Sequence, residues 1–109
     1  MIQTSRAQVK NAADEGDVNK AREKEKFGRE RELSDIQHIL STAQGRRFLW
    51  RYLETCGIYR SSFTGSSETF YLEGQRNIGL KLLADITEAS PESYMLMMKE
   101  QKQREKNNE

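Results

Sequence analysis

The feature that most constrains the fold of this chain is the uneven distribution of its apolar side chains. Eight of its nine aromatic residues lie between Phe48 and Tyr94. Residues 14–32 instead carry thirteen charges, seven acidic and six basic, and residues 99–109 contain no apolar side chain. Because folding is driven mainly by the burial of apolar surface, a chain with this pattern can form a core only in its central part.

We therefore predict three parts: a charged arm over residues 1–32, a helical domain over residues 33–98 and a charged tail over residues 99–109. A chain of 109 residues has room for one small core at most. The arm lacks the apolar seam of a coiled coil, which leaves two interpretations. It is either disordered or ordered as a helix on a partner. In the second case its sparse apolar anchors are Val18, Phe27 and Leu33.

The spacing of apolar residues predicts an all-α fold, a small bundle of about four helices, since no segment alternates as a strand would. A capping box of Ser34 and Gln37 predicts the start of the first helix of the domain. The second helix is expected over residues 42–56 and the third over residues 68–88. Ser90, followed by a proline and a glutamate, predicts the N-cap of the fourth helix.

The same patterns predict which residues pack. Gly57 is expected to end the second helix in the left-handed conformation, and Gly74 and Gly79 are expected to mark close contacts of the third. The predicted packing residues of the second helix are Phe48, Leu49, Tyr52, Leu53 and Cys56. Those of the third are Tyr71, Gly74, Ile78 and Leu82, with Leu72, Gly79, Leu83 and Ile86 beside them. Those of the fourth are Tyr94, Met95 and Met98.

The composition argues against several classes of protein. A net charge of +1 gives no overall signature of a nucleic-acid-binding or membrane-surface protein, and no apolar run approaches the roughly 18 residues of a membrane span. The single cysteine, Cys56, cannot form an intramolecular disulfide, which is typical of a reducing compartment. With one cysteine and one histidine, we expect no structural metal and no cofactor.

The segment RSSFTGSSETFYLEGQRN, residues 60–77, raises the question of a phosphate site. A turn rich in glycine and serine before a helix can bind an anion through its free amides. The spacing of a P-loop is absent, however, because Phe70 lies five residues after Gly65. In addition, Glu68 in the first helical turn would repel a phosphate. We therefore expect a turn and a helix N-cap formed by Gly65, Ser66 and Ser67.

Two residues invite a catalytic interpretation that their surroundings do not support. Arg60 follows Cys56 after only three residues, whereas a phosphatase loop has Cys-x5-Arg, and the thiol continues an apolar stripe. We therefore expect an inert, buried cysteine. His38 and Asp35 lie three residues apart on one helix, and no serine has the G-x-S-x-G setting of a nucleophile. The chain is therefore expected to have no enzymatic activity and no catalytic residue.

The candidate partner-binding residues are arginines interleaved with aromatic side chains. They are Arg46, Arg47, Trp50, Arg51, Tyr59 and Arg60. Three interpretations are open. The arginines form structural ion pairs that tie the second helix to the third, or they belong to a protein interface, whose hot spots are commonly Trp, Tyr and Arg. In the third interpretation they bind nucleic acid through phosphates and stacked bases. The acidic residues available for the ion pairs are Glu54, Glu68 and Glu73.

Four sequence blocks within residues 45–86 carry a family resemblance: G-R-R-F-L-W-R, C-G-I-Y-R, S-F-T-G-S-S-E-T-F and E-G-Q-R-N-I-G-L. Together they resemble the Bbp-nineteen-like phage domain, a small family of tailed-phage proteins. The resemblance covers somewhat under half of the chain. It implies a phage origin and a place among the products of virion morphogenesis, but it carries over no catalytic motif and no functional residue.

The sequence and the resemblance predict a non-enzymatic bacteriophage structural or assembly protein. It would act as a helical docking module in the virion, at the portal vertex, the internal core or the head–tail region. Its expected partners are phage virion proteins and copies of itself, and its expected locations are the virion and, during assembly, the host cytoplasm. The alternative is a nucleic-acid-binding accessory protein that uses the basic and aromatic face.

Overall fold

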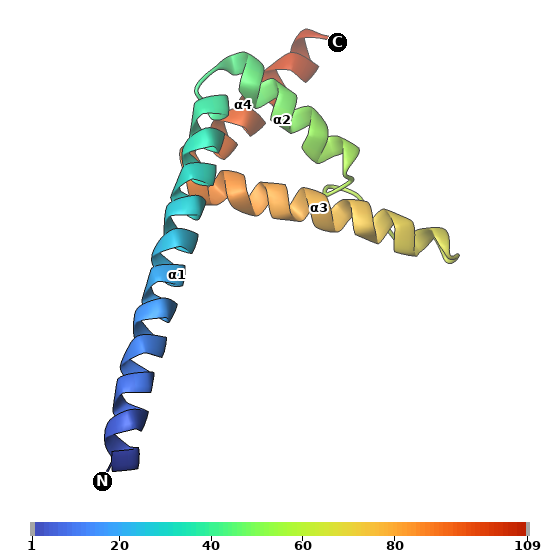
Figure 1. The fold of residues 1–109 in the computed structure, drawn as a ribbon. Coiled ribbons are helices and arrows are strands. Elements are labelled where there is room, and N and C mark those ends of the chain that lie inside the picture. The colour runs from blue at the N-terminus through green and yellow to red at the C-terminus, as the bar shows by residue number, and fades with distance from the viewer. Residues whose placement is uncertain (1, 109) are drawn as a thin grey trace. The chain divides into compact units, whose positions relative to one another are not determined.

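A computed structural model describes the backbone of residues 2–108, and the side chains from residue 14 onward (Figure 1). Four α-helices follow one another along the chain, and no strand occurs within residues 2–108. The prediction of an all-α fold with about four helices is therefore confirmed. The helices are α1 (Ile2–Leu40), α2 (Ala43–Thr55), α3 (Glu68–Ala89) and α4 (Pro91–Asn107).

The chain divides into two units, one up to Glu32 and one from Leu33 onward. The first unit is a stretch of α1, whose described side chains from residue 14 onward are mostly exposed. Its charges form local ion pairs, with Lys26 Nζ 4.0 Å from Glu30 Oε1. Such exposed i, i+4 pairs stabilise a helix by only about 0.3–0.5 kcal/mol each. The helical form of this unit therefore depends on many weak local terms.

The capping box predicted at Ser34 is not formed, because α1 continues without a break through Ser34 to Leu40. The residues before Ser34 contain no proline, and the charged side chains there are good helix formers. A serine can act as an N-cap only where the preceding backbone leaves the helix. Ser34 has the sequence context of an N-cap, but it cannot cap a helix because the residues before it are already helical.

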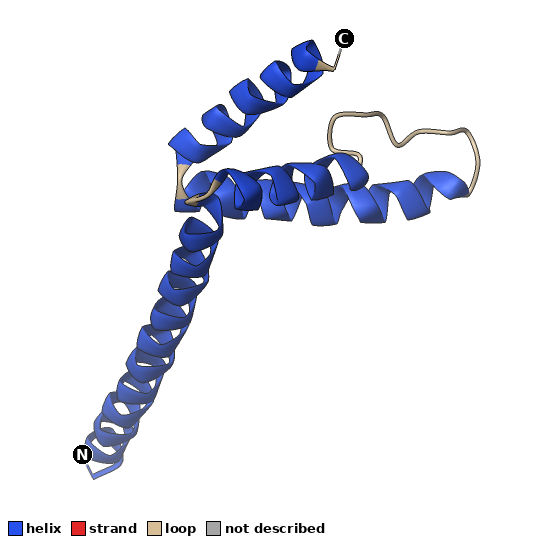
Figure 2. Cartoon of the chain, turned by 90° about the horizontal axis from the view of Figure 1, so that it is seen from above, coloured by secondary structure: helices blue, strands red, loops and turns tan. Residues whose placement is uncertain are grey.

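The core lies in the second unit, where α2, α3 and α4 contact one another pairwise (Figure 2). The end of α1 contributes Leu40 to this core, and the Gln37 amide donates a hydrogen bond of 2.7 Å to the carbonyl of Ala89. That bond satisfies one of the free carbonyls at the end of α3. The buried hydrophobic residues are Leu40, Leu49, Leu53, Ile58, Ile86, Ala89 and Met97.

The turn between α1 and α2 depends on two residues. Thr42 has extended backbone angles and its hydroxyl accepts a 3.0 Å hydrogen bond from the Gly45 amide, so it caps α2. Gly45 lies so close to the preceding chain that a Cβ there would be 1.8 Å from the carbonyl oxygen of Ile39. Only glycine therefore fits at the first turn of α2.

Gly57 ends α2 as predicted, with φ of 75° in the left-handed region. The close contact of α3 predicted at Gly79 is also present, because a Cβ there would lie 2.5 Å from the Cβ of Cys56. The prediction for Gly74 is wrong, since no heavy atom lies within 4 Å of the equivalent position there. The two glycines lie five residues apart on α3, so they face different directions.

Several predicted packing residues are exposed instead. On α3, Tyr71 and Ile78 are exposed, and the helix packs through Gly79 and Ile86. On α4, Met97 is buried, while Met95 and Met98 are exposed. Apolar spacing identified each helix correctly but left its rotation undetermined, because these helices carry apolar residues on more than one side.

Candidate functional site

Helix α2 has two faces that carry different chemistry. Its inner face buries Leu49 and Leu53 in the core. Its opposite side presents four exposed residues, which we call the outer face: Arg47, Phe48, Arg51 and Tyr52. These residues recur at i, i+1, i+4 and i+5, so they form a continuous stripe along the helix.

The outer face is held together by ring and cation contacts. The rings of Phe48 and Tyr52 pack 4.9 Å apart between centroids, and the Arg51 guanidinium lies 5.5 Å from the Phe48 centroid and 5.7 Å from that of Tyr52. Phe48 and Tyr52 nevertheless remain 48% and 45% exposed. Half-exposed aromatic rings beside arginine are the composition that protein interfaces favour.

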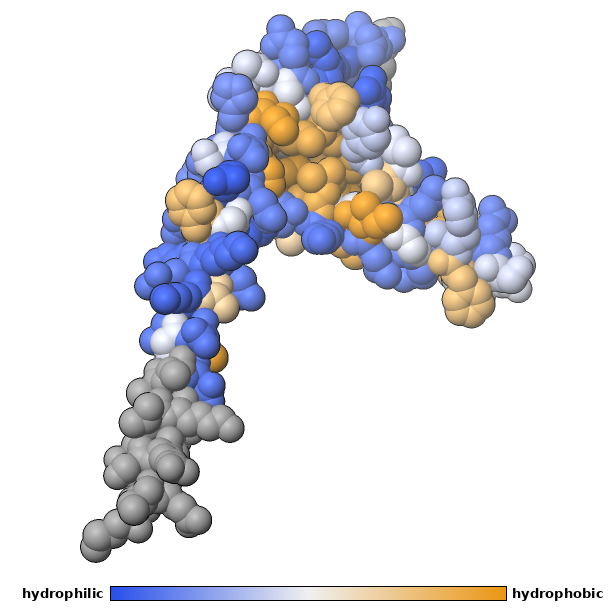
Figure 3. All heavy atoms as spheres, viewed as in Figure 1, coloured by the Kyte–Doolittle hydropathy of each residue, from blue (hydrophilic) through white to orange (hydrophobic). Residues whose placement is uncertain are grey.

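The second unit also exposes apolar surface outside α2. Figure 3 shows orange, apolar residues gathered over α2 and α3. Ile39 at the end of α1 and Ile78 on α3 are also exposed apolar residues of this unit. Exposed apolar patches of this kind commonly mark contacts with another protein.

Arg46 does not belong to the outer face. Its Nε donates to Glu100 Oε1 at 2.7 Å, its Nη2 to Glu100 Oε2 at 3.3 Å and its Nη1 to the carbonyl of Leu40 at 2.8 Å. The side chains of the pair are only 15% and 24% exposed. Arg46 is therefore a structural residue that joins α1, α2 and α4.

This ion pair differs from one of the three interpretations that the sequence left open. In that interpretation, arginines of the second helix pair with acidic residues at 54, 68 and 73, and so tie the second helix to the third. The structure instead pairs α2 with α4 through Glu100, which lies in the segment expected to be a charged tail. Helix α4 runs through that segment to Asn107, and this continuation places Glu100 beside α2.

Trp50, Tyr59 and Tyr94 form an aromatic cluster on another side of α2. The rings of Trp50 and Tyr59 stack with centroids 5.3 Å apart, and the hydroxyls of Tyr59 and Tyr94 are 2.9 Å apart. The Trp50 indole N–H donates to the carboxylate of Glu54. Burial raises the pKa of Tyr59 above its ordinary value, and the hydrogen bond to Tyr94 and the charges of Tyr94 and Glu54 add to this.

A hollow of about 680 Å³ lies beside this cluster. Its polar rim includes Arg60, whose Nη2 donates a 3.2 Å bond to the carbonyl of Glu54, so Arg60 is also engaged within the chain. The lining residues are Trp50, Glu54, Thr55, Tyr59, Arg60 and Glu105. Stacked rings with a carboxylate rim suit contact with another chain better than binding of an anion.

The structure therefore separates the six sequence-predicted site residues. Arg47 and Arg51 lie on the outer face of α2, whereas Trp50, Tyr59 and Arg60 surround the hollow. Arg46 is used internally. The sequence prediction omitted Phe48 and Tyr52, which had been expected in the core. A signal was available, because Phe48, Leu49, Tyr52 and Leu53 together form a stripe wider than one buried face requires.

The turn from Arg60 to Ser67 satisfies its polar groups internally. The Ser62 hydroxyl donates to the carboxylate of Glu73, and the Thr64 amide donates a 2.9 Å bond to Thr69 Oγ1. Ser67 precedes α3 without a side-chain cap bond, and Ser66 Oγ instead accepts from the Glu68 amide at 3.4 Å. The expected turn is present, but the side chain that reaches the helix amides is that of Ser66.

Two phenylalanines project from this region. Phe63 in the turn is 78% exposed and Phe70 in the first turn of α3 is 83% exposed. The hydrogen bonds of the turn hold the backbone between them, so both rings are presented from an ordered segment. Aromatic rings displayed in this way are suited to entering a pocket of a partner.

The residues considered for catalysis have different surroundings. Cys56 is half-buried rather than buried, packs against Gly79 and the core, and lines a small hollow with Arg60. His38 on α1 is exposed. No group of His, Cys, Asp and Glu suited to a metal ion occurs among the described residues. Within the same part of the chain, no helix is long and apolar enough to cross a membrane.

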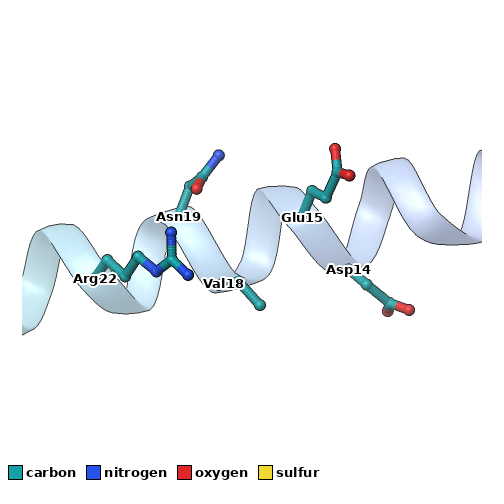
Figure 4. Close-up of a pocket in the computed structure, with 5 residues that line it drawn as sticks. All are labelled: Asp14, Glu15, Val18, Asn19 and Arg22. Carbon is teal, nitrogen blue, oxygen red and sulfur yellow. The ribbon is translucent and has the colours of Figure 1, made fainter.

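Another surface hollow lies along the first unit, in the close-up of Figure 4. All of its lining residues come from one helix, and Figure 4 shows Glu15 and Asn19 on one side of α1 with Asp14 and Val18 on the other. A hollow bordered by a single helix is open to solvent and encloses no ligand. Its charged side chains are therefore surface groups available to a partner.

The comparison with protein families gives one match. The model of the Bbp19-like phage protein family matches residues 36–99. That range is more than half of the 109-residue chain and spans α2, α3 and about half of α4, so this chain belongs to the Bbp19-like phage protein family. The family resemblance noted in the central sequence blocks is thereby confirmed. The comparisons with curated proteins and with solved structures gave no match.

Proposed function

We propose that this phage protein is a non-enzymatic structural or assembly component of the virion. Its helical unit, from Leu33 onward, would dock on other virion proteins at the portal vertex, the internal core or the head–tail region. The protein would assemble in the host cytoplasm and remain in the particle. The observation that carries this proposal is that the family match falls on the helical unit, which also displays the exposed aromatic surfaces.

The exposed side chains of the helical unit support a docking role. Its core is small, whereas Phe48, Tyr52, Phe63 and Phe70 keep large parts of their rings in water. Covering such rings in an interface would release water from apolar surface at about 25 cal/mol per Å². A small helical unit of this kind therefore gains stability when a partner covers it.

Mass spectrometry of purified particles tests this proposal directly. We expect the protein in mature particles or in assembly intermediates at a fixed ratio to the major structural proteins. Density for the four helices should then appear at one location in a particle reconstruction. Absence of the protein from both particles and intermediates would overturn the proposal.

A second candidate function is the binding of nucleic acid. The observation that favours it is that neither Arg47 nor Arg51 has an ion-pair partner among the described residues. This candidate predicts affinity for duplex DNA that falls steeply as salt increases, because phosphate contacts release counterions. Absence of DNA binding at low salt would remove it. The internal use of Arg46 leaves fewer arginines for this role than the sequence suggested.

A further inference from the structure

We propose that the outer face of α2 binds a second copy of this chain, through the acidic segment Asp14–Val18 of that copy. The inference rests on the proposed docking function of the helical unit, and it names the partner of one surface. The unit from Leu33 onward carries a basic and aromatic helix face, and the unit up to Glu32 carries an acidic and aliphatic one.

The outer face of α2 carries two positive charges that no carboxylate in the described part of the chain pairs with. Arg47 and Arg51 lie one helical turn apart and project into solvent, and no carboxylate in the described part of the chain forms an ion pair with either. The Arg51 guanidinium lies against the rings of Phe48 and Tyr52. Two guanidiniums flanked by half-exposed rings favour a partner that offers carboxylates next to a small apolar side chain.

The segment Asp14–Val18 offers that chemistry. It contains three carboxylates and no basic residue, and its side chains are exposed. The nearest basic residues that follow are Lys20 and Arg22, and Arg22 lies one helical turn beyond Val18 along the same hollow. Asp14 and Val18 are four residues apart and lie on the same side of α1 in Figure 4, while Asp17 lies three residues after Asp14 and so flanks the same face. No ion pair to the three carboxylates occurs among the side chains that the structure describes.

The two surfaces match in spacing as well as in charge. Arg47 and Arg51 are separated by one turn of α2, as Asp14 and Asp17 are by about one turn of α1. With the helices packed along one another, each carboxylate can meet one guanidinium, and Val18 can lie on the rings of Phe48 and Tyr52. The pairing of apolar contact with opposite charge favours a helix of this chain over the uniformly anionic surface of DNA.

Such an interface joins two different surfaces, and each copy carries one acidic segment and one outer face. Two copies can therefore pair reciprocally in a two-fold dimer, or many copies can join head to tail in a ring or an open chain. The expected result in solution is association beyond the monomer as concentration rises. Because the contact depends on exposed charges, it should weaken as salt is added.

Charge reversal followed by mixing tests the proposal. The full-length variants R47E/R51E and D14K/D17K should each stay monomeric in sedimentation velocity at low salt, under conditions in which the original chain associates. We expect association at least about tenfold weaker in each, as for the loss of close charge pairs at an interface. Mixing the two variants should restore association, since one then supplies carboxylates and the other guanidiniums.

Three controls make the result specific. The variant K99E/K102E introduces the same change of net charge as R47E/R51E, at two exposed positions of α4, and should associate as the original chain does. The neutral variant R47Q/R51Q should weaken association without introducing repulsion. Circular dichroism should show unchanged helix content in all variants, because none of the substituted residues belongs to the core.

Several outcomes would overturn the proposal. They are an original chain that stays monomeric at low salt and high concentration, charge-reversed variants that associate normally, and a mixture that fails to recover association. These outcomes are distinct from failure of the proposed function, which depends on finding the protein in particles. A protein present in particles but monomeric in solution would refute only the contact between copies.

Discussion

At the scale of single residues, the two glycines of α3 have opposite surroundings. A Cβ on Gly79 would lie 2.5 Å from Cys56 Cβ and from Ile58 Cγ2, whereas the same atom on Gly74 would meet open space. Both glycines have ordinary helical backbone angles, since only Gly57 and Gly65 have positive φ in the described chain. The difference between them is therefore one of packing alone.

This difference predicts opposite effects for the same substitution. Gly79→Ala should lower the free energy of unfolding by about 1–3 kcal/mol, because the core must shift to admit the methyl group. Gly74→Ala should raise it by about 0.5–1 kcal/mol, since alanine is the better helix former and nothing obstructs it. Urea denaturation of both variants checks the pair. Equal effects would contradict the close approach of α3 to α2.

Tyr59 gives a prediction for alkaline pH. Its pKa is raised in the folded chain, mainly by burial. The unfolded chain therefore loses this proton first, at about pH 10, while the folded chain keeps it. The contribution of Tyr59 to stability is thus complete below pH 10 and declines as pH rises above it. Tyr59→Phe should be less stable near neutral pH, because it loses the Tyr94 hydrogen bond, but its stability should fall less steeply above pH 10.

Thermal unfolding followed by circular dichroism between pH 8 and pH 11 measures this difference in slope. Tyr71→Phe is a suitable control, because that tyrosine is exposed on α3. Its pH profile should follow that of the original chain. Parallel profiles for Tyr59→Phe and the original chain would contradict the altered pKa.

At the scale of the helices, the link between α2 and α4 is the contact that the sequence did not reveal. Arg46 and Glu100 are 54 residues apart and form a two-bond ion pair at the edge of the core. Another N–H of the Arg46 guanidinium, on Nη1, donates to the carbonyl of Leu40, the last residue of α1. Helix α4 therefore owes part of its position to a residue beyond the last apolar one.

Removing one partner of this pair should be costly. Arg46→Met and Glu100→Gln are each expected to lower the free energy of unfolding by about 1.5–3 kcal/mol, the range for hydrogen bonds to charged groups. The double variant should lose less than the sum of the two, because the residues interact directly. A double-mutant cycle by urea denaturation measures the coupling. Additive losses would show that the pair contributes no stability of its own.

Urea denaturation also distinguishes the structural role of Arg46 from that of its exposed neighbour Arg47. If Arg46 is a structural residue, Arg46→Met should change stability, while Arg47→Met should leave it nearly unchanged, since Arg47 is exposed and unpaired in the described chain. The expected change for Arg47→Met is within about 0.5 kcal/mol, as for most surface positions.

At the scale of the whole molecule, all buried residues of the core lie in the unit that begins at Leu33. The segment up to Glu32 contributes none of the described core residues. We expect a chain that starts at residue 33 to unfold cooperatively. Its thermal unfolding midpoint should lie within about 4 °C of the value for the full-length chain. Thermal unfolding of the two chains measures this. A large fall in the midpoint would mean that the charged segment stabilises the helical unit.

The sequence by itself determined the helical class, the segment that carries the core and several helix ends. These features rest on local physics: apolar spacing, the left-handed Gly57 and the proline that opens α4. Each such signal acts within about one helical turn, so it can be read from neighbouring residues.

Only the tertiary structure decided which side of each helix is covered and which arginine is internal. Phe48 and Leu49 are adjacent and similarly apolar, yet Leu49 is buried and Phe48 half exposed. Arg46 and Arg47 are adjacent and equally basic, yet only Arg46 meets a carboxylate. The reason is physical: burial and ion pairing depend on where distant helices lie, and the position of α4 beside α2 is not encoded within any single turn.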